Sequence, residues 1–397
     1  MVGAGDALVD GANRPRIVHC FRSPVGGIFR HVRDLVEMQV ADGASVGIVC
    51  DSSTGGAHEE ALFRAIEPQL ALGLHRVPMR RQISPSDLTA FIRLYRQMKA
   101  LRPDIIHTHG AKGGAYGRVI GALLRLSGSP AARLYCPHGG SLHYDVASRS
   151  GKVFFLLERA LERFTDAFVF VSAFEAEAFR AKVGVPRRPF VIASNGIRDA
   201  EFVPVETEAD AADFLYIGMM RDLKGPDLFL AALAKIRDET GAAPRALMVG
   251  DGPDTERYRR QATELGLAAT TRFHAAMPAR KAFAMARIVV VPSRAESMPY
   301  IVLEAIGANR PLVATDVGGI PEIFAEQRTR LVPPGSAEAL ATEMRRLSDD
   351  PATAEAEAAA LRESIRPRFS VEAMARNVSE AYGLARGRKV LPGPEMP

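Results

Sequence analysis

Two glutamates in the second half of the sequence have the spacing to bind a phosphorylated sugar. Glu296 and Glu304 lie on either side of Pro299, a residue that suits the first turn of a helix. Glu296 is therefore expected in a loop and Glu304 inside the helix. The N–H groups of Ser297 and Met298 would lie at the positive end of the helix dipole, which attracts phosphate. Carboxylates beside such an anion site are typical of a nucleotide-sugar site, and the alternative is a pair of surface charges.

Two basic residues lie in a second loop of the same half. Arg221 and Lys224 belong to the segment YIGMMRDLKGPD (216–227), which leads from a predicted strand into a predicted helix. Arginine offers a planar fork of donors and lysine a mobile point charge, and this combination suits a diphosphate. The alternative interpretation is a solvated loop without a ligand.

Glycines and histidines follow predicted strands in the first half. Gly26 and Gly27 open a helix after the first strand, so that their N–H groups can approach a phosphate, although a tight turn has the same sequence. His138 ends another strand and can bond a sugar hydroxyl or a phosphate. A structural histidine is the alternative, and we favour it for His107, which alternation places on the same side as His109.

Short β-branched segments position these residues and alternate with helical patterns. The pattern restarts after Ile197, which predicts an α/β protein with two doubly wound parallel sheets. Ligands of such sheets bind beyond the carboxyl ends of the strands, and two facing domains would form a cleft there. The predicted strands are 16–20, 45–51, 74–79, 104–110, 133–139, 167–172, 213–218, 245–252, 271–276, 288–293, 311–319 and 329–334.

The same pattern divides the chain into domains. Residues 16–200 are predicted as an N-terminal Rossmann-like domain on the acceptor side, and residues 201–374 as a C-terminal domain that binds the nucleotide sugar. The acidic segment Glu201–Asp210 is interpreted as the linker. A final helix at about 375–390 is expected to pack back on the N-terminal domain. Residues 1–15 have no basic segment before an apolar one and are predicted to be a disordered leader rather than a signal peptide.

Composition excludes several classes of protein. Apolar residues make up 47% and charged residues 24% of the 397 residues, which excludes a disordered or fibrous chain. No apolar segment approaches the roughly 18 residues of a membrane span. Cys20, Cys50 and Cys136 are far apart and form no C-x-x-C pair, which excludes a zinc ribbon or a disulfide framework.

Charge differs between the two halves. Residues 1–200 contain 26 Lys and Arg against 18 Asp and Glu, whereas residues 201–397 contain 25 against 28. A basic N-terminal half suits a phosphate-bearing acceptor or a transient contact with an anionic membrane surface. Arg80, Arg81 and the arginines between 118 and 133 are candidate contacts, and a solvated arginine-rich surface is the alternative. Nucleic acid is not expected, because Trp is absent and no basic run is interleaved with aromatic residues.

Taken together, these motifs resemble glycosyltransferase family 4, a group of retaining enzymes with the GT-B fold. The resemblance extends from about Arg16 to about Ala385. In the second half it rests on Glu296 and Glu304, Arg310-Pro311, VGGIPEI (317–323) and the loop ending in Lys224-Gly225. In the first half it rests on Gly26-Gly27, DIIHTHG (104–110), His138 and Asn195-Gly196-Ile197.

The resemblance implies a role for each candidate residue. Glu304 would bind the ribose hydroxyls, Glu296 would bind hydroxyls of the donor sugar, and His138 would lie beside the reacting sugar. Arg221 and Lys224 would neutralise the diphosphate. Catalytic roles are implied for His138, Glu296, Arg221 and Lys224, and nucleotide-binding roles for Gly26, Gly27, Gly218, Arg221, Lys224, Glu296, Ser297, Met298 and Glu304. Met219 occupies the position where the family often has an arginine in Gly-Arg-Leu, so Arg221 is expected to replace it.

The implied reaction moves a sugar from a nucleoside diphosphate sugar, UDP-linked, to a hydroxyl of a lipid-linked or saccharide acceptor with retention of configuration. Polysaccharide, lipid-linked oligosaccharide or glycolipid synthesis at the cytoplasmic face of the inner membrane would use such an enzyme. No cofactor is expected besides the donor. No metal is expected either, because the sequence has no Asp-x-Asp motif and offers no evident His/Cys cluster.

Other functions remain open at this point. A nucleotide-sugar 2-epimerase or a phosphorylase with a GT-B-like fold would share the donor site. A Rossmann oxidoreductase needs G-x-G-x-x-G after the first strand, where this chain has Ser-Pro-Val-Gly-Gly. A sugar-nucleotide binder without catalysis is the third alternative. Release of nucleoside diphosphate only when an acceptor is present would distinguish a transferase from an epimerase.

Overall fold

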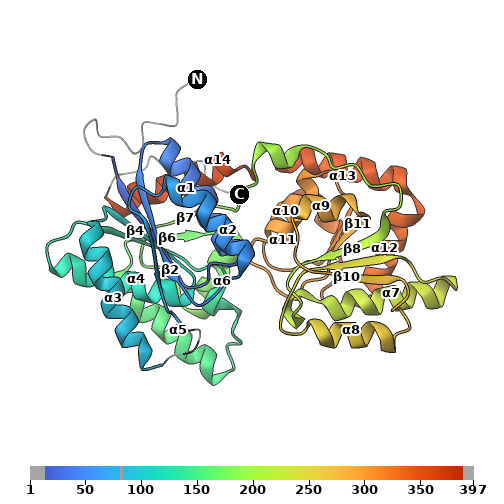
Figure 1. Cartoon of the computed structure of the whole chain (residues 1–397), viewed down its shortest axis with the longest axis horizontal. Helices are drawn as coiled ribbons and strands as arrows, with labels where there is room; N and C mark the ends of the chain where they lie inside the picture. Colours follow the sequence, from blue (N-terminus) through green and yellow to red (C-terminus); the bar gives the residue numbers. More distant parts are fainter. Residues whose placement is uncertain (1–13, 81, 83, 388–397) are drawn as a thin grey trace. The chain divides into compact units, whose positions relative to one another are not determined.

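The computed structural model describes residues 14–80, 82 and 84–387, which form two compact units (Figure 1). The first unit contains the chain up to Ser194 together with the segment from Val371 onward, and the second contains Asn195–Ser370. Each unit has one parallel sheet with helices, which confirms the predicted α/β class. Residues 1–13 of the predicted leader lie outside the described residues.

The first unit contains a seven-stranded sheet of order β3-β2-β1-β4-β5-β6-β7. Its central strands are buried on both faces, as their continuous apolar sequences require. The short strand β7 was not predicted, because only three residues pair with β6. The strands are β1 (Arg16–Phe21), β2 (Ser45–Asp51), β3 (Leu74–Val77), β4 (Ile105–His109), β5 (Ala132–Cys136), β6 (Ala167–Phe170) and β7 (Phe190–Ile192).

Helices cover this sheet, and the last helix among the described residues is one of them. α14 packs beside α1 and also contacts β5, β6 and β7, whereas α3 packs beside α4 (Figure 1). The α-helices are α1 (Gly26–Ala41), α2 (Ala57–Ile66), α3 (Ser86–Leu101), α4 (Ala111–Leu126), α5 (Arg149–Leu161), α6 (Ala173–Lys182) and α14 (Val371–Ala385). Short 3-10 helices are η2 (Glu67–Gln69), η3 (Gly140–His143) and η4 (Glu162–Phe164).

The second unit has a five-stranded sheet of order β10-β9-β8-β11-β12. Apolar side chains of β8, β9, β11, α7 and α12 form its core. The strands are β8 (Ala212–Ile217), β9 (Ala246–Val249), β10 (Thr271–His274), β11 (Ala286–Val291) and β12 (Leu312–Ala314). The helices are α7 (Pro226–Thr240), α8 (Thr255–Glu264), α9 (Ala279–Ala284), α10 (Tyr300–Gly307), α11 (Ile320–Phe324), α12 (Ala337–Asp349) and α13 (Pro351–Ile365), with η5 (Asp199–Phe202), η6 (Asp222–Lys224) and η7 (Ala325–Arg330).

Two local predictions were wrong. The segment 329–334 was expected to be a strand, but only Val332 forms an isolated bridge, to Thr315, because the two prolines that follow have no N–H to donate. The expected linker Glu201–Asp210 belongs to the second unit instead. Phe202 is buried there, and the backbone N–H of Val205 donates to Ala308.

Among the described residues, we find no helix with both the length and the apolar character that a membrane span requires.

Candidate active site

The candidate residues of the second unit gather where its strand order reverses. β8 and β11 are neighbours in the sheet, and the chain continues from β8 to β9 on one side of this pair and from β11 to β12 on the other. Lys224 ends η6 in the connection after β8, and Glu296 lies in the connection after β11. The two loops therefore meet beyond the carboxyl ends of adjacent strands, the position where sheets of this kind bind ligands.

Lys224 and Glu296 form an ion pair at this switch point. The Lys224 Nζ atom lies 2.6 Å from Oε1 and 2.7 Å from Oε2 of Glu296. The Ser293 hydroxyl donates to Glu296 Oε1 at 2.7 Å, and the glutamate side chain is only 7% exposed against 30% for the lysine. The carboxylate is thus fixed by two donors, while the ammonium group keeps an open side.

Backbone packing holds the loops together. Gly225 has a φ of 69°, and a Cβ atom there would collide with the carbonyl oxygen of Pro292. Gly318 has a φ of 60°, and a Cβ atom there would collide with the carbonyl oxygen of Glu296. The connections after β8, β11 and β12 therefore come into direct contact only because two of their residues have no side chain.

Arg221 and Gly218 lie in the connection after β8. Arg221 precedes η6 and is half-buried, and its guanidinium group makes no ion pair with any residue that the structure describes. Gly218 donates its backbone N–H to Val249, and Gly250 packs against its carbonyl group. An arginine without a carboxylate partner, beside the Lys224–Glu296 pair, gives this edge of the sheet cationic groups that can bind an anion.

The predicted helix after Glu296 is α10. It begins at Tyr300, one residue after Pro299, and carries the half-buried Glu304. Met298 is buried, and its carbonyl oxygen accepts a hydrogen bond of 2.7 Å from the Asn195 side chain. Ser297 accepts the N–H of Gly319 on its carbonyl oxygen. The sequence thus placed Glu296 in a loop and Glu304 on a helix correctly, whereas the amide of Asn195 as a support for this loop was not predicted.

The candidates of the first unit lie at the equivalent edge of the other sheet. Gly26 and Gly27 begin α1, and Gly26 has a φ of 62°. His138 follows β5 and also has a positive φ, 52°, which is uncommon for a residue with a side chain. Its Nε2 atom lies 3.0 Å from Nδ1 of His109, the last residue of β4. Gly26, Gly27 and His138 therefore belong to the first unit, whereas the Lys224–Glu296 pair belongs to the second.

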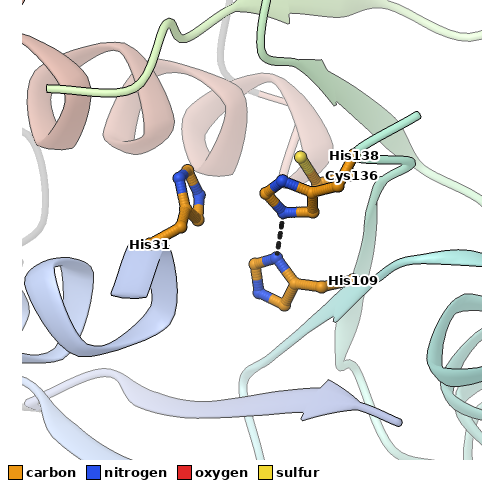
Figure 2. Close-up of side chains that lie close together, drawn as sticks. All are labelled: His31, His109, Cys136 and His138. Carbon is orange, nitrogen blue, oxygen red and sulfur yellow. Dashed lines mark hydrogen bonds between the residues drawn. The ribbon is translucent and has the colours of Figure 1, made fainter. Parts of the chain in front are cut away.

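His138 is part of a cluster that the sequence did not reveal. Figure 2 shows His31 from α1, His109 from β4, and Cys136 and His138 from β5 and the turn after it. One ligand atom from each residue lies within 4.8 Å of the other three. The expectation that no His/Cys cluster is present was therefore wrong. Sequence spacing could not reveal it, because three separate elements supply its members.

A buried hydrogen-bond chain continues from this cluster. His109 Nε2 lies 3.0 Å from His19 Nδ1, and His19 Nε2 lies 2.9 Å from the Gln39 side-chain oxygen. The Gln39 amide nitrogen donates to the Tyr382 hydroxyl at 2.9 Å, and that hydroxyl lies 3.0 Å from His107 Nδ1. The expectation that His107 is a structural histidine agrees with this position in the interior.

Burial keeps these histidines neutral. It lowers the pKa of His19 to about 4, and it lowers the pKa values of His107, His109 and His138 well below 6.5. A neutral imidazole has one donor and one acceptor nitrogen, so a chain of such rings has a defined direction. His19, Gln39 and Tyr382 were not predicted as members of the site.

Two family models match this chain in adjacent regions. The model described as Glycosyltransferase Family 4 matches residues 25–201, and the model described as Glycosyl transferases group 1 matches residues 211–350. They cover the candidate residues of both units and confirm the resemblance seen in the sequence. The chain is a glycosyltransferase of the family 4 type.

Full-length comparisons agree with this family. The glycogen synthase of Mycobacterium tuberculosis is 25% identical over 395 residues, which cover 94% of either chain. Sucrose-phosphate synthase from Thermosynechococcus elongatus has a similar structure, with a TM-score of 0.74, 24% identity and coverage of 93% of this chain and 98% of that one. HepE of Anabaena, solved in complex with UDP, gives a TM-score of 0.72 at 17% identity, with coverage of 93% and 99%. This glycosyltransferase therefore has the GT-B fold, with two Rossmann-like units.

The structure corrects the predicted basic contacts of this glycosyltransferase. Arg118 is fully buried and pairs with Glu158 at 2.8 Å. Arg133 and Arg125 both pair with Asp166. Arg118 thus joins α4 to α5, and Arg133 joins β5 to the segment before β6. These two arginines are buried and do not face a membrane, because a buried guanidinium needs a carboxylate partner. Arg81, another predicted contact, lies outside the described residues.

Proposed function

We propose that this glycosyltransferase moves a sugar from a nucleoside diphosphate sugar, UDP-linked, to an acceptor hydroxyl with retention of configuration. The observation that carries the proposal is the Lys224–Glu296 pair at the switch point between β8 and β11. The UDP bound to the structurally similar HepE supports the choice of nucleotide.

In this proposal the basic residues stabilise the negative charge of the leaving diphosphate. As the glycosidic bond breaks, the diphosphate gains negative charge, and the guanidinium group of Arg221 and the ammonium group of Lys224 stabilise it. Fixed donors of this kind contribute about 2.7–4 kcal/mol each to transition-state stabilisation. Lys224 already has its charge oriented by Glu296, so little reorganisation is needed when the donor binds. These two cations replace a divalent metal at the phosphates, in agreement with the lack of an Asp-x-Asp motif.

The carboxylates recognise the sugar rings of the donor. Glu296 accepts hydroxyls of the transferred sugar, and Glu304 accepts the two ribose hydroxyls. The backbone of Gly218, Ser297 and Met298 supports the diphosphate. On the acceptor side, Gly26 and Gly27 offer N–H groups, and His138 contacts the reacting sugar. Retention follows a front-face attack, in which the departing phosphate oxygen takes the proton of the acceptor hydroxyl.

The acceptor belongs to polysaccharide, lipid-linked oligosaccharide or glycolipid synthesis in this proposal. One exposed face of α5 supports a transient contact with the cytoplasmic side of the inner membrane. Val153, Leu156 and Leu157 are 57%, 71% and 45% exposed, and Arg149 and Lys152 are exposed on the same helix. Apolar side chains beside basic ones are typical of helices that lie in an anionic interface. In this proposal α5 makes the membrane contact for which the arginines between 118 and 133 are candidates in the sequence alone.

A donor panel tests the proposal. Purified protein is incubated with different nucleotide sugars, with and without saccharide or lipid-linked acceptors, and released nucleoside diphosphate is measured. We expect UDP release that requires an acceptor. Release without any acceptor, or conversion of the donor into an isomer, would favour the epimerase alternative and contradict the proposal.

A variant locates the site. Glu304→Ala removes two hydrogen bonds from the ribose to a carboxylate, each worth about 1.5–3 kcal/mol, so UDP affinity should fall at least about 10-fold. The exposed Glu326 gives a control, Glu326→Ala, with wild-type affinity expected. Equal affinity in the two variants would overturn the assignment of Glu304.

A further inference from the structure

We propose that His31, His109, Cys136 and His138 bind a divalent transition-metal ion with the properties of Zn²⁺. The four ligand atoms lie within 4.8 Å of one another at the carboxyl ends of β4 and β5 (Figure 2). This site lies in the first unit, whereas the proposed phosphate-binding cations Arg221 and Lys224 belong to the second. A metal site here would be additional to the groups assigned to the donor in the proposed transfer reaction.

The donor set determines the class of metal. Three imidazole nitrogens and one thiolate suit Zn²⁺ and related ions, whereas Mg²⁺ and Ca²⁺ prefer oxygen ligands. Tetrahedral zinc with bonds of about 2.0–2.3 Å separates its ligand atoms by roughly 3.3–3.6 Å. The cluster reaches that size if its widest separation shortens by roughly 1 Å. His31, His109 and Cys136 are buried, and the half-buried His138 gives the ion access.

The hydrogen-bond chain behind the cluster prepares His109 as a ligand. The Gln39 oxygen can only accept, so His19 donates from Nε2 and keeps its lone pair on Nδ1. His109 must then donate from Nε2 to His19, which leaves the lone pair of His109 on Nδ1, the atom that faces His138. Metal-binding histidines are oriented in this way by a partner on their other nitrogen.

The Gln39 amide is itself held in one orientation. Its nitrogen donates to the Tyr382 hydroxyl, which then donates to His107 Nδ1. Thus α14 determines, through Gln39 and His19, which nitrogen of His109 has the lone pair.

Metal binding would replace the hydrogen bond between His138 and His109 with coordination of both rings to the ion. Without an ion, His138 donates from Nε2 to His109 Nδ1 at 3.0 Å. With Zn²⁺ bound, His109 Nδ1 and His138 Nε2 both coordinate the ion. The proton of His138 then moves from Nε2 to Nδ1 by exchange with water, and the Cys136 thiol releases its proton to solvent. His138 then no longer contacts the reacting sugar. Zn²⁺ should therefore inhibit sugar transfer, a consequence that rests on the proposed function.

Cobalt provides a direct probe of the site. Untagged full-length protein is stripped with EDTA, dialysed and titrated with Co²⁺. We expect one equivalent to give the intense visible bands of tetrahedral Co²⁺ and a thiolate-to-cobalt charge-transfer band, both removed by Zn²⁺. Cys136→Ser should lose the charge-transfer band and more than about 100-fold in affinity, whereas Cys50→Ser, a buried cysteine on β2 outside the cluster, should bind as wild type does.

A second pair of variants keeps the test independent of folding. His31→Gln removes one ligand, and Gln39→Leu removes the group that orients His19 and should weaken binding about 10- to 100-fold. Thermal unfolding of each metal-free variant shows whether it is folded. The absence of stoichiometric binding, a weak octahedral cobalt spectrum or equal affinity in wild type and Cys136→Ser would overturn the site. Tight binding that leaves sugar transfer unchanged would instead count against the role of His138 in the proposed function.

Discussion

Gln39 and Tyr382, which are 343 positions apart in the sequence, form a buried hydrogen bond of 2.9 Å inside the first unit. Gln39 lies on α1 and Tyr382 on α14, and the two helices pack side by side (Figure 1). α14 thereby contributes to the polar interior beside β1 and β4, which carry His19 and His107. Through His19, the same contact reaches the two histidines that end β4 and follow β5.

Removal of the Tyr382 hydroxyl should destabilise the first unit. In Tyr382→Phe, the Gln39 amide and His107 Nδ1 lose their shared partner while they stay buried. A buried polar group without a partner costs about 1–3 kcal/mol, so the free energy of unfolding should fall by that amount or more. Urea unfolding measures it. Tyr144→Phe, at a tyrosine that is 40% exposed, is the control, and an equal effect of both changes would contradict the role of this hydrogen bond.

Stability should decrease as the pH falls below about 6.5. The pKa of His19 is about 4 in the folded state, against 6.5 for an ordinary histidine, because burial disfavours the charged ring. The unfolded chain then binds a proton between these pH values that the folded chain does not bind. Each such histidine lowers the free energy of unfolding by up to about 1.4 kcal/mol per pH unit in that window.

His107, His109 and His138 act in the same direction, since burial also lowers their pKa values. Carboxylates with a lowered pKa, such as Asp166, also stabilise the folded state. Their contribution to the free energy of unfolding is lost only as the pH falls below their ordinary pKa of 3.8, outside this window. Urea unfolding between pH 7.5 and 5 would reveal the slope, and His19→Asn should reduce it. A free energy of unfolding that is constant over this range would show that the histidines are protonated in the folded protein.

Lys224 should be required for turnover. Lys224→Ala removes one cation from the leaving diphosphate, and we expect kcat to fall about 100- to 1,000-fold. Steady-state release of nucleoside diphosphate measures this. Lys235→Ala changes a half-buried lysine on α7 of the same unit, away from the switch point, and should leave kcat unaltered. A small effect of Lys224→Ala would assign the charge stabilisation to Arg221 alone.

Sugar transfer should persist in excess EDTA. In the proposed function, Arg221 and Lys224 supply the positive charge that a divalent ion provides in other enzymes, and Glu296 orients the ammonium group of Lys224. Initial rates with and without chelator test this, with a metal-dependent glycosyltransferase assayed in parallel. Complete loss of activity that is restored by Mg²⁺ or Mn²⁺ would require a metal site at the diphosphate.

The apolar face of α5 should bind anionic membranes. Leu156 is 71% exposed between other apolar and basic residues of the helix. Leu156→Asp should reduce cosedimentation with anionic liposomes about 10-fold, since insertion of one leucine contributes about 1.5–3 kcal/mol. Binding should also decrease as salt rises, because ions screen the surface potential. Val203→Asp, at an exposed valine of the second unit, is the control. If Leu156→Asp leaves liposome binding unchanged, the assignment of the membrane contact to α5 would be wrong.

The sequence alone determined those features that depend on neighbouring residues. Continuous apolar segments predicted buried parallel strands, and Pro299 correctly separated a loop containing Glu296 from a helix containing Glu304. Such patterns are local, because strand burial and helix initiation depend on residues a few positions apart. Gly225 and Gly318 allow the loops to come into contact because they have no side chain. The sequence did not reveal that they lie against the carbonyl groups of Pro292 and Glu296.

Only the tertiary structure decided which distant residues meet. Sequence order keeps His31, His109 and Cys136 far apart, and the parallel order of β1, β4 and β5 brings them within reach of one another. The same is true of the arginines between 118 and 133: their basic charge was evident, but burial against Glu158 and Asp166 was not. Whether a histidine can bind a metal, or an arginine can face a membrane, depends on the residues that lie next to it. The order of the strands in the sheet determines which residues these are.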